Sequence, residues 1–100
     1  MTDPYIGAWS LLIEDTPQGN VSATMTITKT TEGAYSGTVN SDVGAFNLYD
    51  VKIIDRRLTA GFMVQGAEFD IIGNFENSLF KGYVSGMGDD YQANGTKILE

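Results

Sequence analysis

The stretch that decides the fold is one in which apolar and hydroxyl side chains alternate without interruption, Val21-Ser22-Ala23-Thr24-Met25-Thr26-Ile27-Thr28. Successive side chains of an extended strand point to opposite faces, so the apolar residues share one face and the hydroxyl residues the other. The pattern predicts a half-buried β-strand. Comparable runs recur at residues 5–14, 34–40, 45–54, 58–64, 67–75, 79–85 and 91–98. The chain is therefore predicted to be all-β, with about eight strands.

The gaps between these runs are short and rich in turn-forming residues, as in Gln65-Gly66 and Glu76-Asn77-Ser78. A parallel return needs a crossover of about a dozen residues, so consecutive strands must pair antiparallel. This predicts a single up-and-down meander in one domain, residues 1–100. Joining the first strand to the last removes both exposed edges, so we expect a small closed β-barrel, with two packed sheets as the alternative.

Composition narrows the classes of function. The chain has 6 basic and 13 acidic residues and a net charge of −7, which disfavours nucleic acid and anionic membranes as partners. It contains no cysteine and no histidine, so we expect no metal site, no cofactor and no Ser-His or Cys-His catalytic arrangement. The sequence shows no export signal and no apolar stretch of membrane-spanning length, and a cytoplasmic location is expected.

Alternation assigns a mostly apolar set of side chains to the barrel interior. A change of parity within residues 45–54 requires a bulge at Tyr49 and Asp50. An eight-stranded barrel is just wide enough to be filled by side chains or to hold one small ligand, and small residues such as Ala23 and Ala60 favour some open space. The predicted inward residues are Trp9, Leu11, Ile13, Val21, Ala23, Met25, Ile27, Tyr35, Val39, Phe46, Leu48, Val51, Ile53, Leu58, Ala60, Phe62, Val64, Phe69, Ile71, Phe75, Phe80, Val84, Ala93 and Lys97.

Several residues are candidates for contact with a ligand. Asp50 and Tyr35 are also the candidates for catalysis, since the bulge can turn Asp50 inward, where burial would raise its pKa. The alternatives are that Asp50 stabilises the bulge and that the tyrosines pack at the rim. The candidate ligand-binding residues are Met25, Tyr35, Asp50, Phe62, Phe69, Tyr83 and Tyr91.

Gly7-Ala8-Trp9 near the start and Lys97 near the end resemble the calycin pattern of lipocalins and streptavidin-like barrels. This resemblance implies that Trp9 closes one end of the barrel and that Lys97 packs across its ring. The wider pattern, with Tyr35-Ser36-Gly37-Thr38, Leu48-Tyr49-Asp50-Val51 and Gly95-Thr96-Lys97-Ile98, is similar to lipocalin-like domains appended to bacterial amidohydrolases. For function the resemblance implies binding of a small, largely apolar molecule.

Three functions remain open at this point. The first is non-catalytic binding of a small apolar ligand in the interior, and the second is a cofactor-free cyclase or isomerase acting on a polyketide- or polyene-like substrate. The third is a structural protein-interaction domain with a filled core. Apolar residues of the outward parity, Leu12, Met63 and Ile72, also predict homodimerisation through the barrel wall.

Overall fold

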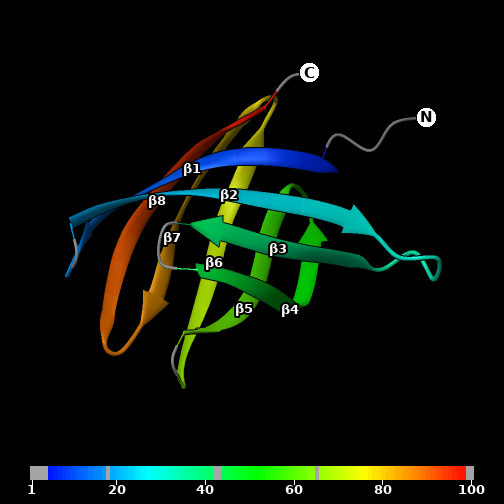
Figure 1. The fold of residues 1–100 in the computed structure, drawn as a ribbon. Helices are drawn as coiled ribbons and strands as arrows, with labels where there is room; N and C mark the ends of the chain where they lie inside the picture. Colours follow the sequence, from blue (N-terminus) through cyan, green and yellow to red (C-terminus); the bar gives the residue numbers. More distant parts are fainter. Residues whose placement is uncertain (1–4, 18, 42–43, 65, 99–100) are drawn as a thin grey trace.

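A computed structural model describes residues 5–17, 19–41, 44–64 and 66–98, which form a closed barrel of eight antiparallel strands in meander order (Figure 1). The barrel closes because β1 pairs with both β2 and β8. No helix long and apolar enough to cross a membrane occurs among these residues. The strands are β1 (Gly7–Thr16), β2 (Gly19–Lys29), β3 (Tyr35–Ser41), β4 (Gly44–Ile54), β5 (Arg57–Val64), β6 (Ala67–Glu76), β7 (Leu79–Gly86) and β8 (Asp89–Lys97).

The meander gives the barrel two distinct ends. The connections β2–β3, β4–β5 and β6–β7 lie at the end where β1 begins and β8 finishes, and the other connections lie at the opposite end. In Figure 1 the β1–β2 and β7–β8 turns lie on the left, away from the start of β1. We call the end where β1 begins the Trp9 end, and the opposite end the mouth.

Tight turns set the register of the hairpins. At β4–β5, Asp55 and Arg56 have φ of 51° and 67° and join the paired residues Ile54 and Arg57. Positive φ at both central residues is the backbone of a two-residue hairpin turn that matches the twist of the strands. Bulges interrupt the ladder between Ile13 and Thr16 and, as predicted, between Tyr49 and Lys52.

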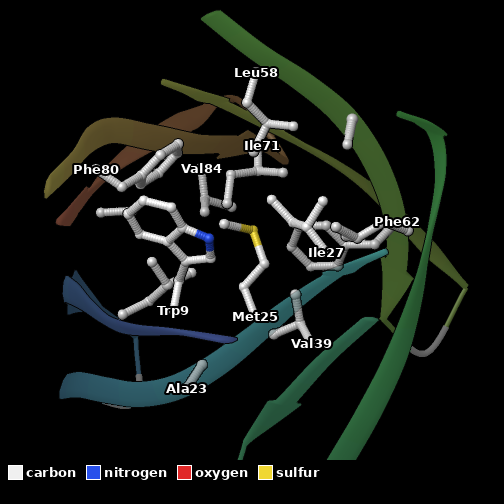
Figure 2. Packing of buried hydrophobic residues seen from close by; sticks show 14 of the residues in the cluster. Trp9, Ala23, Met25, Ile27, Val39, Leu58, Phe62, Ile71, Phe80 and Val84 are labelled. Carbon is white, nitrogen blue, oxygen red and sulfur yellow. The ribbon is translucent and has the colours of Figure 1, made fainter. Parts of the chain in front are cut away.

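The core confirms the predicted alternation. Every buried hydrophobic side chain among the described residues belongs to the predicted inward set. Figure 2 shows Met25 near the middle of the cluster, with Trp9 and Phe80 to one side and Phe62 to the other. The strand ends differ slightly from the prediction, because Tyr5 lies in a turn and the bulge after Ile13 lets β1 continue to Thr16.

Candidate functional site

Aromatic packing closes the Trp9 end of the barrel. Trp9 is fully buried, its Nε1 donates a hydrogen bond to the Tyr5 carbonyl at 3.1 Å, and its ring centroid lies 4.8 Å from that of Phe75. Tyr5 also packs on Phe75, with ring centroids 4.9 Å apart. Lys97 Nζ lies 5.8 Å from the centroid of the Trp9 ring, within range of a cation–π interaction. The contact implied by the calycin resemblance is therefore present.

Backbone conformation and the path of Lys97 explain why the first residue of the Gly-x-Trp element is glycine. Gly7 has a φ of +134°, a conformation that side chains rarely adopt, and a β-carbon there would lie 3.2 Å from Lys97 Cε. Glycine at this position therefore lets the aliphatic stem of Lys97 cross β1 on its way to the indole. Gly7, Trp9 and Lys97 act together as the closure of this end.

The mouth is open. A cavity of about 290 Å³ lies there, and every strand contributes at least one residue to its wall. Its wall combines small side chains, Ala23 and several valines, with larger aromatic ones. The lining residues are Ile13, Thr16, Pro17, Val21, Ala23, Val39, Ser41, Phe46, Phe62, Val64, Phe69, Val84, Met87 and Tyr91.

Three phenylalanines form an aromatic wall in this cavity. The rings of Phe62 and Phe69 stack with centroids 5.6 Å apart and planes 16° apart, and Phe46 lies 6.1 Å from Phe62. Gly86 makes room for this arrangement, since a β-carbon there would lie 2.3 Å from the Phe69 ring. The wall therefore depends on a glycine of the neighbouring strand β7.

The polar groups in the wall are few. Thr16 Oγ1 donates a hydrogen bond to the Gly19 carbonyl, and Ser41 Oγ donates one to the Gly44 carbonyl at 3.2 Å. Half-buried Tyr91 adds a phenol hydroxyl, which can donate and accept. No carboxylate or amine occurs among the described residues that line the cavity. The wall is suited to holding an apolar body with one or two polar contacts.

The structure brings together three of the predicted ligand-binding residues, Phe62, Phe69 and Tyr91. Met25 is fully buried and pairs with Trp9 across β1 and β2, so it belongs to the packed core and not to the cavity wall. Tyr35 lies at the Trp9 end, with its ring 6.4 Å from that of Tyr5. Lys29 Nζ is 5.3 Å from the Tyr35 centroid.

Two further predicted residues, Asp50 and Tyr83, also lie outside the cavity wall. Asp50 is exposed and does not line the cavity, because the bulge places it in the left-handed region, with φ of 53°, on the outer surface. Tyr83 is 39% exposed, since Val84 takes the inward position on β7. Of the two alanines expected to leave space, Ala23 lines the cavity and Ala60 lies in the packed core.

Sequence reasoning missed Met87 at the rim. Met87 is 78% exposed, lines the cavity, and has a φ of 53° in the β7–β8 turn. An unbranched apolar residue is uncommon in that conformation, where asparagine and glycine are favoured. The sequence feature that could have indicated Met87 is an exposed-type turn, Gly86-Met87-Gly88, with an apolar residue between two glycines.

The outer wall carries a separate polar contact. The Tyr49 hydroxyl donates a hydrogen bond to Glu68 at 3.0 Å. Loss of hydration raises the pKa of Tyr49 above its ordinary value, and the Glu68 carboxylate raises it further as acceptor and as a negative charge. Nearby Asp70 and Asp50 act in the same direction.

The residues predicted to mediate dimerisation do not form one patch. Leu12 on β1 is 40% exposed and Met63 on β5 is 52% exposed, whereas Ile72 on β6 is half-buried. In a closed barrel of eight strands, β5 lies across from β1, so Leu12 faces away from the other two residues. Homodimerisation stays a prediction.

Comparison with known proteins does not assign this site. No protein-family model matches the chain, and no curated protein matches it in sequence. Among the described residues, no group of three His, Cys, Asp or Glu side chains is placed to hold a metal ion.

Proposed function

We propose that this protein binds a small, largely apolar molecule in the mouth cavity and does not transform it. The observation that carries the proposal is an open, mostly apolar cavity of about 290 Å³ at one end of an otherwise packed barrel. A cavity of about 150 Å³ is enough to hold benzene, so this space fits a body about the size of two fused aromatic rings. Ligand sites of proteins are typically concave and apolar, with a few polar groups.

The lining favours binding over the alternatives. General acid–base catalysis needs a titratable group within reach of the reacting atom, and among the described lining residues the tyrosine phenol of Tyr91 is the one such group. A cyclase or isomerase would therefore have only the shape of the cavity and the Tyr91 phenol, among the described lining residues, to act with. A purely structural domain with a filled core would leave no cavity of this size. We also propose that the chain is a calycin-type barrel, on the strength of Gly7, Trp9 and Lys97 at the closed end.

Calorimetric titration with 2-naphthylmethanol, a neutral bicyclic alcohol, tests the proposal. A ligand of this size is expected to bind at one site with a Kd on the order of 100 µM. Val64→Glu places a carboxylate in the wall and should weaken binding by at least about tenfold, since burying an unpaired charge is costly.

Met63→Glu is the matched control, because Met63 is the adjacent residue of β5, faces outward and is 52% exposed. It should bind the alcohol as the parent does. The proposal is overturned if the parent shows no binding, or if both variants lose binding to the same extent.

A further inference from the structure

Basic residues are absent from the described part of the mouth, whereas acidic residues occur at both ends of the barrel, with Glu32, Asp55 and Glu76 at the Trp9 end. The described residues of the mouth segments, 13–17, 19–21, 39–41, 44–46, 62–64, 66–69 and 84–91, include no lysine or arginine. All 6 basic residues of the chain lie elsewhere. Lys29, Arg56, Arg57 and Lys97 are at or next to the Trp9 end, and Lys52 and Lys81 lie on the strands. The described carboxylates of the mouth segments are Glu14, Asp15, Glu68, Asp89 and Asp90.

One of these carboxylates stands on the inner face. Asp89, Tyr91 and Ala93 alternate along β8 and therefore share one face of the strand. Ala93 is fully buried and Tyr91 lines the cavity, so Asp89 is the next position of this alternation toward the mouth; its side chain is exposed and lies outside the cavity lining. Its cross-strand partner is Gly86, the residue over which the Phe69 ring lies. Asp89 thus pairs with the strand position that the Phe69 ring covers and is one inward position away from Tyr91 along β8.

This arrangement is attractive to cations and repels anions. Clefts that carry one sign of charge raise the local concentration of the opposite sign, and a low-dielectric wall strengthens the effect. The Tyr91 phenol, which lines the cavity, can also accept a hydrogen bond from an ammonium group. Asp89 could instead be a solvated turn residue that contributes only to the net charge. In that case the preference for cationic ligands would not depend on the position of Asp89.

We propose that the ligand of the mouth cavity is a cationic amphiphile, with an apolar body against Phe62 and Phe69 and an amine at Asp89. This inference rests on the proposed function, because it assigns a chemical class to the molecule held in the same cavity. It excludes carboxylate-headed ligands such as fatty acids, whose anionic group would have to sit among acidic residues.

Three probes with one hydrocarbon body separate the inference from the proposed function. They are 2-naphthylmethylamine, 2-naphthylmethanol and 2-naphthoate, titrated by calorimetry at pH 7 in about 20 mM and about 300 mM salt. At low salt the amine should bind at least about tenfold tighter than the carboxylate, with the alcohol between them, and high salt should narrow the difference. Equal binding of the three, or tighter binding of the carboxylate, overturns the inference but leaves the proposed function intact. Failure of all three to bind overturns both.

A pair of single-charge variants tests the position. Asp89→Asn should weaken amine binding about three- to tenfold and leave alcohol binding unchanged. Glu76→Gln removes the same charge from the end of β6 at the opposite end of the barrel and should leave both affinities unchanged. Circular dichroism confirms that each variant is folded. Equal losses in the two variants would mean that net charge, and not Asp89, sets the preference, and would overturn the assignment.

Discussion

Replacing Ala23 with leucine tests whether the mouth cavity is empty. Ala23 and Ala60 are both 6% exposed, but Ala23 lines the cavity and Ala60 lies in the packed core. The substitution adds roughly three carbon groups, each contributing about 0.8 kcal/mol when buried, so filling the cavity could stabilise the fold by up to about 2 kcal/mol. The same substitution at Ala60 overpacks a filled region and should destabilise by about 1–3 kcal/mol. The free energies of unfolding of the two variants should therefore differ by about 1–5 kcal/mol.

Urea denaturation followed by circular dichroism gives both free energies of unfolding. Titration of 2-naphthylmethanol into the Ala23→Leu protein should show weakened binding, because leucine occupies the space that the naphthalene needs. Equal destabilisation by the two substitutions would refute the reasoning, since it would mean that the space beside Ala23 is already filled. Unchanged binding to a stable Ala23→Leu protein would place the ligand elsewhere.

Three further predictions concern the ends and the outer wall. Trp9→Ala should lower the free energy of unfolding by about 3–5 kcal/mol. Lys97→Met keeps the aliphatic stem and should lower it by about 0.5–1 kcal/mol. Similar denaturation midpoints for the two variants would contradict the role of Trp9 in closing this end. Met87→Asn should raise stability by about 1 kcal/mol by relieving the left-handed backbone, and a lower thermal midpoint would count against that strain. The raised pKa of Tyr49 contributes stability below the ordinary tyrosine pKa of about 10, and this contribution is lost as pH rises through the raised value. Glu68→Gln should lower the Tyr49 pKa in NMR titration of its ring carbons, and no change would contradict the role of the carboxylate.

The fold was predictable because period-two alternation carries direct information about burial. Residues from Val21 to Thr28 fix the inward face of β2, and turn chemistry between runs fixes antiparallel pairing. The bulge at Tyr49 was predictable for the same reason, since only an extra residue restores the parity between Leu48 and Val51.

The candidate site was predictable only in part. Alternation indicates on which face of the strand a side chain lies, but not its position along the barrel axis. Phe62 and Phe69 line the cavity, whereas Met25 lies in the packed core and Tyr35 lies at the Trp9 end of the barrel, although both share the inward face. For Asp50, a bulge shifts the parity of the following residues, and its own direction depends on backbone torsions that alternation does not specify. Once β1 is known to pair with β8, the order of the hairpins shows at which end of the barrel each residue lies.

The pairing of β1 with β8 has a consequence for how the chain folds. Trp9 pairs with Lys97, so the seam of the barrel joins residues from opposite ends of the sequence. Contacts of such long sequence separation close the largest loop and place this topology among slow folders, on a scale of milliseconds to seconds. The 1 tryptophan of the chain sits at that seam, so its fluorescence reports on ring closure. During synthesis, the edge of β1 that pairs with β8 therefore has no partner until β8 has been made.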